Sequence, residues 1–414
     1  MKNALLYLLF LLLTFATCTR PAQQSVSKTT TLPPTVLMIS LDGFRPDYLD
    51  AARTPNLMQI ANEGVRAKWL IPSFPSKTFP NHYAIATGLY PEHNGIVDNR
   101  FYDPEFNAEF ALGKLPDQNN PRWWLGEPIW TTAEKQGQKA GCFFWVGSEV
   151  PINGVLPTYW KPFDDKVADE ARVDSVLSWL DKPAAQRPTL LTLYFSKVDH
   201  VGHAAGPDSP EVRQAAQDVD ASIGRLLAGL TQRGIANQVN IIVTSDHGMA
   251  AMSTERVVYL DDRINLDMME RTLWGELTQL WPKPGKTDSV YQALKTNPLP
   301  HLTVYKKGEL PARFHYADSR RIAPILCMAE DGWTLTSHPY FGRMRDRLSK
   351  GAHGFDNQLP SMRALFVARG PALKRGYVAE PFENVHIYPL VAEILKLKPA
   401  KTDGTLDSVR VLLK

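Results

Sequence analysis

Three apolar runs, each ending in an aspartate, constrain the fold of this 414-residue chain more than any other feature. They are TVLMISLDG (35–43), TLLTLYFSKVD (189–199) and VNIIVTSDHG (239–248). Each run is rich in β-branched or large apolar residues and precedes a segment compatible with a helix, as buried parallel strands do in βαβ units. The pattern predicts an α/β fold built on a parallel-rich central sheet.

Shorter segments fill in this architecture. A further strand is predicted for RALFVARG (363–370), and the segment 255–350 has the Arg, Pro, Trp and Lys content and the short alternating pieces of an inserted cap. With 44% hydrophobic residues the chain can bury a large core. Helices are predicted at 54–64, 79–87, 129–137, 167–180 and 210–232.

The first 34 residues are expected to lie outside the folded domain. Residues 1–18, MKNALLYLLFLLLTFATC, carry a lysine, an apolar run of about a dozen residues and then small residues, which is typical of a secretory signal and short for a membrane span. We therefore expect an exported protein. Cys18 is either acylated, giving a membrane-anchored lipoprotein, or removed with the signal, giving a soluble periplasmic form. Residues 19–34 are polar and rich in Pro and Thr, as flexible linkers are, and residues 35–414 are expected to form the folded domain.

Charge and cysteine content exclude two classes of protein. The formal net charge of +3 comes from mixed charges, with no basic run or basic-aromatic repeat to follow a nucleic-acid backbone, so no nucleic-acid polymer is expected as a partner. Cys142 and Cys327 are far apart in the sequence and do not form a disulfide framework. They are predicted to be buried free thiols.

Carboxylate and imidazole side chains gather where the predicted strands end. In an open parallel sheet, ligands bind beyond the carboxyl ends of the strands. One aspartate at such an end would most simply cap a helix, but three, accompanied by histidines, indicate a shared site. The candidates are Asp42, Asp199, His203, Asp246, His247 and His353.

The chemistry of these six side chains favours two zinc ions. Carboxylate oxygens and imidazole nitrogens suit zinc, and a metal pair roughly 3.5–4 Å apart can stabilise both the attacking and the leaving oxygen of a displacement at phosphorus. Thr78 lies in SFPSKTFPNHYAIATG (73–88), between a proline-broken loop and an apolar segment that is typical of a helix. A hydroxyl beside zinc can lose its proton and act as a nucleophile, and the N–H groups at a helix start suit a phosphate.

The sequence resembles the nucleotide pyrophosphatase/phosphodiesterase family of the alkaline phosphatase superfamily. The resemblance spans roughly residues 35 to 400 and is carried, in family order, by LDGFRPDYL, TPNLMQIANEG, FPSKTFPNHYAIATGLYPEHNGIVDNRFYD, DHVGHAAGP, SDHGM and GAHGFDN. It implies a three-layer α/β/α sandwich of alkaline phosphatase type with an inserted cap. The implied activity is hydrolysis of phosphodiester or pyrophosphate bonds in small nucleotides and their derivatives, which yields nucleoside 5′-monophosphates.

The resemblance also implies a role for each site residue. Asp199, His203 and His353 would hold one zinc, and Asp42, Asp246 and His247 the other. Thr78 would bridge the metals and form a phosphothreonine intermediate. Asn99 would donate a hydrogen bond to a non-bridging phosphoryl oxygen. Phe79 would stack on the nucleotide base, with Tyr159 in LPTYWKPF on its other side.

Two alternatives use the same bimetal site. A phosphate monoesterase would add cationic groups to hold the extra charged oxygens; Lys161 is the nearby lysine, and the Lys-x-Arg pairing of some threonine-type monoesterases is missing because Pro162 and Phe163 follow it. A choline-lipid phosphodiesterase would need an aromatic and acidic cage for the ammonium group. The candidates for such a cage are Trp123, Trp124, Glu127 and Asp164.

Overall fold

An eight-stranded mixed sheet forms the centre of the described part of the chain, residues 32–414, in the computed structural model. The predicted signal segment, Cys18 and most of the linker lie outside the described residues. The strand order is β19-β2-β18-β9-β1-β8-β6-β7. These strands are β1 (Thr35–Leu41), β2 (Val65–Ala67), β6 (Ala140–Phe143), β7 (Tyr159–Lys161), β8 (Leu190–Phe195), β9 (Val239–Thr244), β18 (Phe366–Arg369) and β19 (Tyr377–Ala379).

The three apolar runs lie side by side, as predicted. β1 pairs in parallel with both β8 and β9, with Ser40 opposite Tyr194 on one side and Thr244 on the other. Their carboxyl ends therefore meet at one edge of the sheet. The predicted strand β18 is confirmed and runs antiparallel to β9. Since the chain enters β18 from that same edge without a crossover helix, it must run back in the opposite direction.

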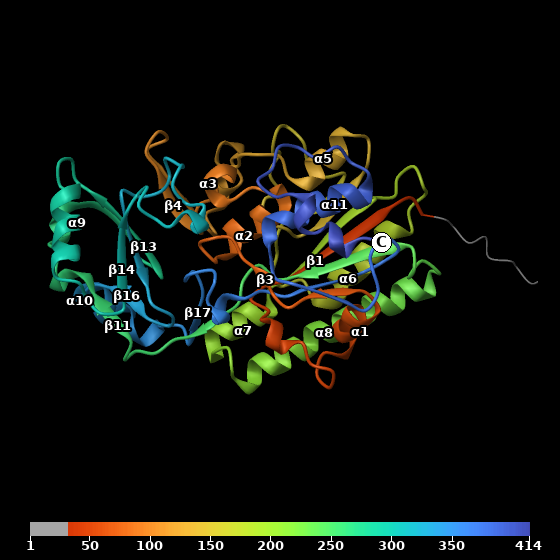
Figure 1. The fold of residues 1–414 in the computed structure, drawn as a ribbon. Coiled ribbons are helices and arrows are strands. Elements are labelled where there is room, and N and C mark those ends of the chain that lie inside the picture. The colour runs from red at the N-terminus through yellow and green to blue at the C-terminus, as the bar shows by residue number, and fades with distance from the viewer. Residues whose placement is uncertain (1–31) are drawn as a thin grey trace, which may run out of the picture. The chain divides into compact units, whose positions relative to one another are not determined.

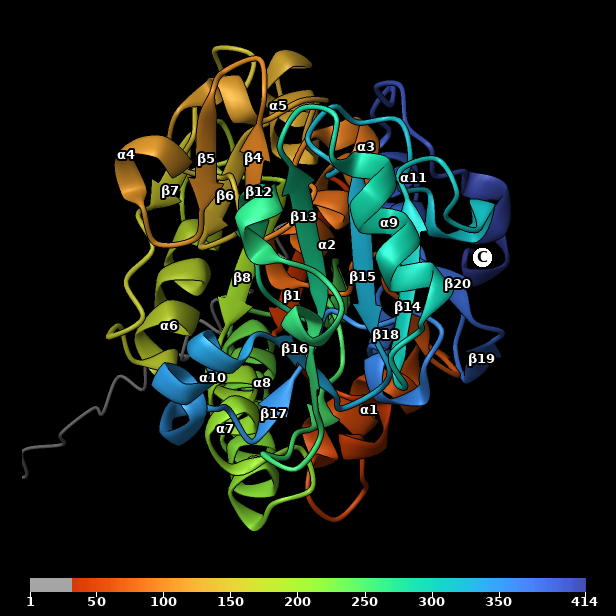
Figure 2. The same cartoon turned by 90° about the vertical axis from the view of Figure 1, so that its left-hand side faces the viewer.

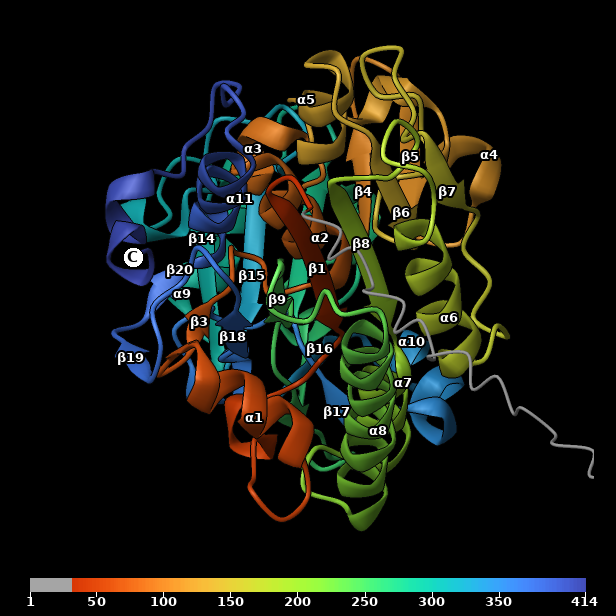
Figure 3. The same ribbon diagram turned by 90° about the vertical axis from the view of Figure 1, so that its right-hand side faces the viewer.

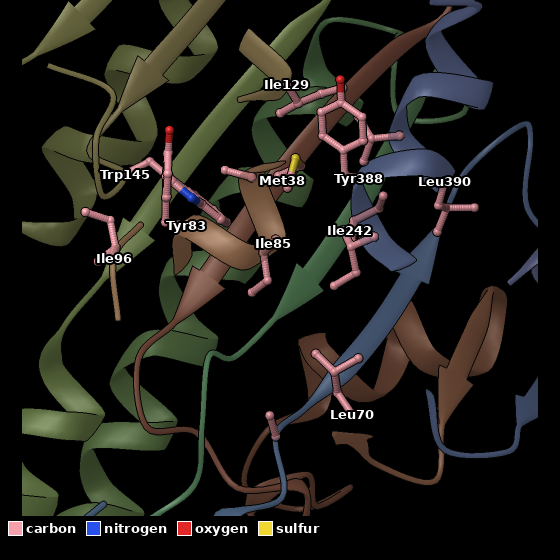
Figure 4. Packing of buried hydrophobic residues seen from close by; sticks show 14 of the residues in the cluster. Met38, Leu70, Tyr83, Ile85, Ile96, Ile129, Trp145, Ile242, Tyr388 and Leu390 are labelled. Carbon is pink, nitrogen blue, oxygen red and sulfur yellow. The ribbon is translucent and has the colours of Figure 1, made fainter. Parts of the chain in front are cut away.

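Helices cover both faces of the sheet (Figures 1 and 3). Because successive side chains of β1 point to opposite faces, Leu37 and Ile39 pack against one set of helices and Val36 and Met38 against the other. Figure 4 shows the second cluster around Met38. The first face carries α1 (Pro55–Glu63), α6 (Asp169–Leu180) and α8 (Pro210–Gln232), and the second carries α2 (Thr78–Thr87), α5 (Ile129–Lys135) and α11 (Ile387–Leu395).

The predicted helices are confirmed to within two residues at each end. Their local signals explain this agreement. At the start of α8, the Ser209 side chain accepts a hydrogen bond from the Val212 N–H, and Pro210 occupies the first helical position, where no N–H is needed. At the end of α2, Gly88 adopts the left-handed conformation that terminates many helices.

The segment predicted as a cap contains a sheet of its own. Its antiparallel strands have the order β12 (Met269–Leu273), β13 (Leu277–Pro282), β15 (Ile325–Ala329) and β14 (Leu302–Lys306). Helix α9 (Thr287–Thr296) packs on β13 and β14 (Figures 1 and 2). Val290 and Leu294 of this helix share a buried cluster with Leu280, Val304 and Ile325 of the sheet.

Both ends of this insert are held together at its base. β10 (Ala250–Ala251) pairs antiparallel with β17 (Gly351–Ala352), and β11 (Val257–Tyr259) pairs in parallel with β16 (Thr334–Thr336). Thus the chain leaves and re-enters the main domain at one point. The insert also contains α10 (His338–Met344).

Cys142 and Cys327 are buried free thiols, as predicted. Among residues 32–414, no helix combines the length and the apolar character that a bilayer crossing requires. The other elements are β3 (Leu70–Ile71), α3 (Pro91–Asn94), β4 (Arg100–Asp103), β5 (Ala108–Ala111), α4 (Leu115–Gln118), α7 (Lys197–Ala205) and β20 (Phe382–Glu383).

Candidate metal centre and nucleophile

The six predicted ligands form two groups. In each group the ligand atoms lie within 4.8 Å of one another. The grouping is the one that the family resemblance implies. We call Asp42, Asp246 and His247 the closed triad, and Asp199, His203 and His353 the open triad.

The closed triad is built by two neighbouring parallel strands. Asp42 follows β1, and Asp246 and His247 follow β9. The backbone holds them in place, because the Asp42 N–H donates to the Phe195 carbonyl at 2.9 Å and the Gly43 N–H donates to Asp246 Oδ1 at 3.2 Å. His247 Nε2 then lies 3.0 Å from Asp246 Oδ2 and 3.5 Å from Asp42 Oδ1.

The open triad is built by a helix and a ribbon. Asp199 and His203 are four residues apart on α7, so they share one face of that helix, with His203 Nε2 3.4 Å from Asp199 Oδ1. His353 follows β17, whose partner β10 begins shortly after His247. The ribbon brings the His247 and His353 rings into a stack with centroids 3.5 Å apart.

Backbone carbonyls fix the orientation of all three imidazoles. Each ring donates through Nδ1: His203 to Gly351 O at 2.7 Å, His247 to Gly248 O at 2.9 Å and His353 to Ser76 O at 3.0 Å. Such a contact sets the tautomer and leaves Nε2 as the free ligand atom. In this site every Nε2 therefore faces the carboxylates.

One oxygen of each carboxylate lacks the hydrogen-bond partner that burial normally requires. Asp42 Oδ1, Asp199 Oδ1 and Asp246 Oδ2 are buried and have no hydrogen-bond partner among the residues that the structure describes. Burial and the neighbouring charges of Asp246 and Asp199 raise the pKa of Asp42 well above its usual value. Uncompensated buried carboxylates are costly unless a cation neutralises them. The donor set therefore fits divalent metal ions at both triads.

Thr78 lies beside the closed triad. Helix α2 begins at Thr78, and its hydroxyl oxygen is 3.2 Å from His247 Nε2. His82, one turn later and fully buried, donates through Nδ1 to the Thr78 carbonyl at 2.9 Å, while its Nε2 lies 2.7 Å from Ser40 Oγ. The first turn of α2 is thus tied to β1, which holds the threonine hydroxyl at the metal site.

Asn99 is held so that its side-chain nitrogen, Nδ2, is free to donate. Its Oδ1 accepts from the Phe79 N–H at 2.9 Å, which leaves the Nδ2 donors for another partner. Lys77, next to Thr78, is instead neutralised within the protein: its Nζ lies 3.2 Å from Asp98 Oδ1 and 3.7 Å from Glu276 Oε2. The contact with Glu276, a residue of the insert, links the nucleophile segment to the insert.

Phe79 and Tyr159 are not brought together. Phe79 packs with Phe110 and Trp124, at centroid distances of 5.9 and 6.2 Å. Tyr159 lies on the edge strand β7 and packs with the helices on the other face of the sheet: its ring stacks on Trp179 at 5.9 Å, and its hydroxyl donates to a backbone carbonyl, that of residue 186. The shared base pocket stays a prediction for Tyr159, and the contacts of its ring and hydroxyl favour a packing role.

Phe163, four residues further along the same segment, is a candidate site residue that the sequence motifs did not indicate. Its side chain is 49% exposed, an unusual fraction for a phenylalanine. It contacts Tyr194 at 5.9 Å between centroids, and the Tyr194 hydroxyl donates to Asp42 Oδ2 at 2.6 Å. Phe163 therefore stands at the rim of the closed triad. The signal was present in LPTYWKPF, where Phe163 is the aromatic residue that ends the run.

The residues proposed for a choline cage do not form one. Trp123 and Trp124 are buried in the main hydrophobic cluster, at 0% and 4% exposure. Glu127 is engaged by the Thr132 hydroxyl and by the Lys135 ammonium. Lys161, the candidate cation for a monoesterase, is exposed on β7.

Comparisons with known proteins agree with this geometry. The type I phosphodiesterase / nucleotide pyrophosphatase family matches residues 36–356. The chain belongs to this family. It is 40% identical, over 92% of its length, to ectonucleotide pyrophosphatase/phosphodiesterase family member 3 of Mus musculus, and 42% identical, over 90% of its length, to an uncharacterized pyrophosphatase/phosphodiesterase of Schizosaccharomyces pombe. It spans 44% of the mouse protein and 79% of the yeast protein.

Solved structures of the phosphodiesterase family share the fold. Murine ectonucleotide pyrophosphatase/phosphodiesterase 5 superimposes with a TM-score of 0.86 at 36% identity, covering 92% of this chain and 100% of the other. An inactive threonine-to-alanine variant of that protein, in complex with AMP, matches equally well. The alkaline phosphatase-like α/β fold predicted from the sequence is therefore confirmed. The family is metal-dependent, and the two triads are its candidate metal sites in this chain.

Proposed function

We propose that this protein is an exported zinc-dependent hydrolase that cleaves phosphodiester and pyrophosphate bonds of nucleotides and their derivatives. It releases nucleoside 5′-monophosphates through a phosphothreonine intermediate. The observation that carries the proposal is the Thr78 hydroxyl, 3.2 Å from His247 Nε2, at the start of a helix and beside buried carboxylate oxygens that have no hydrogen-bond partner among the described residues.

The two triads would each hold one zinc ion. Bound there, the pair would favour the deprotonated form of the Thr78 hydroxyl and offset the negative charge of the phosphoryl group. The Nδ1 contacts with backbone carbonyls orient each Nε2 toward the carboxylates, as a metal ligand requires.

Thr78 is the nucleophile in this mechanism. Its oxygen forms a bond to phosphorus while the bond between phosphorus and the leaving oxygen breaks, which leaves the nucleoside phosphate on Thr78. Water then attacks the same phosphorus, the bond to Thr78 breaks, and the nucleoside 5′-monophosphate departs. Asn99 Nδ2 donates to a non-bridging phosphoryl oxygen together with the Thr78 N–H, because the Phe79 N–H already donates to Asn99 Oδ1 and Pro80 has no N–H.

The nucleotide base is held by aromatic contacts at the rim. Phe79 follows the nucleophile but is only 6% exposed, so we assign the main contact to Phe163, whose ring is exposed next to Tyr194 and thus close to Asp42. Stacking on an aromatic ring contributes about 1–3 kcal/mol per base and tolerates every base. The protein would therefore prefer nucleotides without choosing strongly among them.

Two further observations support this proposal. The matching solved structures include an inactive variant bound to AMP, a nucleoside 5′-monophosphate. The relatives also include a venom phosphodiesterase of Crotalus durissus collilineatus and members named as ectonucleotide enzymes, which supports an exported location.

The test compares three substrates with one chromogenic leaving group: p-nitrophenyl thymidine 5′-monophosphate, p-nitrophenylphosphocholine and p-nitrophenyl phosphate. We expect the highest kcat/KM for the nucleotide diester. Preference for p-nitrophenyl phosphate would make the protein a monoesterase, and preference for the choline ester a choline-lipid phosphodiesterase. Metal analysis of the purified protein should find two zinc ions per chain, and dialysis against a chelator should abolish turnover until zinc is restored.

A further inference from the structure

A cavity of about 250 Å³ opens beside the metal centre, between α7 and the insert. His203 of the open triad forms part of its wall. The other walls come from the turn between β12 and β13, from β16 and from α10, which lies next to β16 in Figures 1 and 2. Neither Phe79 nor Phe163 lines it, so the proposed nucleotide contacts leave this cavity unused.

The metal centre is accessible on this side. The His203 side chain is 34% exposed, whereas those of His353, His247 and Asp42 are 7%, 0% and 2% exposed. The cavity thus meets the centre at the half-exposed member of the six candidate ligands.

The position of the nucleophile indicates which part of a substrate would face this cavity. Thr78 lies at the closed triad, 3.2 Å from His247 Nε2. In an in-line displacement the leaving oxygen departs opposite the attacking oxygen, and a second metal ion would stabilise it there. The residues that would hold this second ion are those of the open triad, where His203 borders the cavity.

The lining suits a flat ring. Trp274 and Tyr340 stack on each other, with centroids 5.9 Å apart and planes inclined by 27°, and together form an aromatic wall. Met252 and Met344 add adaptable apolar surface, and the exposed Arg347 adds a positive charge. The volume falls below the roughly 300–1,000 Å³ of complete small-molecule sites. It therefore fits one ring system of a larger substrate.

We propose that this cavity is a leaving-group subsite, in which Trp274 and Tyr340 stack on a nucleobase or similar aromatic ring carried by the departing half of the substrate. The inference rests on the proposed function, because it presumes attack by Thr78 on a nucleotide phosphoryl group. It predicts a preference for dinucleotide-like substrates over those whose leaving group has no ring.

The test uses two substrates that transfer the same thymidylyl group. Thymidylyl-(3′→5′)-thymidine loses thymidine, and thymidine 5′-triphosphate loses pyrophosphate. Trp274→Ala and Tyr340→Ala should each lower kcat/KM for the dinucleotide roughly tenfold and change that for the triphosphate by less than about twofold, since only the dinucleotide brings a base to the cavity. Trp333→Ala is the matched control, because Trp333 stacks on His301 in the same insert and does not line the cavity.

A binding measurement separates recognition from turnover. Titration calorimetry on Thr78→Ala should give a dissociation constant for the dinucleotide that rises roughly tenfold when Trp274→Ala is added, while that for thymidine 5′-monophosphate stays constant. If Trp274→Ala fails to fold, Tyr340→Ala gives the same test from α10.

The outcomes separate this inference from the proposed function. If the wild type releases thymidine 5′-monophosphate from neither substrate, the proposed function fails. If it cleaves both, but the variants lower both rates equally or leave both unchanged, only the subsite is overturned. A greater loss on a diester with an acyl-bearing leaving group than on the dinucleotide would assign the cavity to an apolar chain and also overturn it.

Discussion

The closed and open triads use the same kinds of donor in different surroundings. The closed triad joins two carboxylates and one imidazole at the ends of neighbouring core strands, and all three side chains are buried. The open triad joins one carboxylate and two imidazoles from a helix and from the exit of the insert, with His203 34% exposed. The fold therefore buries every ligand beside the nucleophile, whereas one ligand of the other triad stays accessible.

The largest effect is expected for Thr78→Ala, which removes the attacking oxygen from the sealed side. Turnover of p-nitrophenyl thymidine 5′-monophosphate should fall by at least about 10⁴-fold, as it does when enzymes lose a covalent nucleophile. Zinc content should stay unchanged, because six other side chains supply the ligand atoms. Both quantities can be measured on the same preparation.

Thr87→Ala is the matched control at the other end of α2. The Thr87 hydroxyl donates to the Tyr83 carbonyl at 2.7 Å and is remote from the triads in the sequence of the helix. Its loss should cost about 1 kcal/mol of stability and leave kcat intact. A Thr78→Ala protein with normal turnover would remove the mechanism and, with it, the functional contrast between the triads.

The next largest effect distinguishes the two triads directly. His247→Ala should lower kcat by about 10³-fold, because this ring is buried beside Thr78, and His203→Ala by about 10–100-fold, because water can enter the vacated position. Added imidazole should restore part of the activity of His203→Ala, since the cavity admits it, and none of that of His247→Ala. Equal rescue of both variants would contradict the sealed character of the closed triad.

The sequence predicted the closed triad better than its surroundings for a physical reason. Asp42, Asp246 and His247 follow directly from strand ends, so a correct reading of two apolar runs already places them together. His203 is similarly local, one helical turn from Asp199. His353 depends on the pairing of β10 with β17 across a whole insert, and the sequence identified it only through the GAHGFDN motif.

The aromatic contacts of the site could not be predicted from the sequence pattern. Tyr159 and Phe163 lie four residues apart in one run, and neither periodicity nor composition says which of them faces the site. The answer lies in long-range packing: Tyr159 is drawn to Trp179 on α6, which leaves Phe163 at the rim beside Tyr194. Likewise, the Trp123-Trp124 pair predicted a cage, but both rings are buried in the hydrophobic core.

A medium effect is expected for Asn99→Asp, which tests how the phosphoryl group is held between the triads. Aspartate keeps an oxygen to accept from the Phe79 N–H but lacks the Nδ2 donors, so kcat should fall by about 10²-fold. The melting temperature should stay close to that of the wild type, because the contact with Phe79 survives. If kcat also stays unchanged, Asn99 only shapes the first turn of α2.

The smallest effect compares the two aromatic candidates on the nucleotide side. Phe163→Ala should raise KM for p-nitrophenyl thymidine 5′-monophosphate by about 5–10-fold, the lower part of the range for a lost base stack, because the exposed ring contributes little to the core. Tyr159→Ala should instead lower the melting temperature, since it removes the stack on Trp179, and leave KM unchanged. Phe163→Ala thus affects nucleotide binding, and Tyr159→Ala affects stability. The opposite result, with KM raised by Tyr159→Ala alone, would return the base contact to β7 and would show that the rim beside the closed triad does not bind the nucleotide.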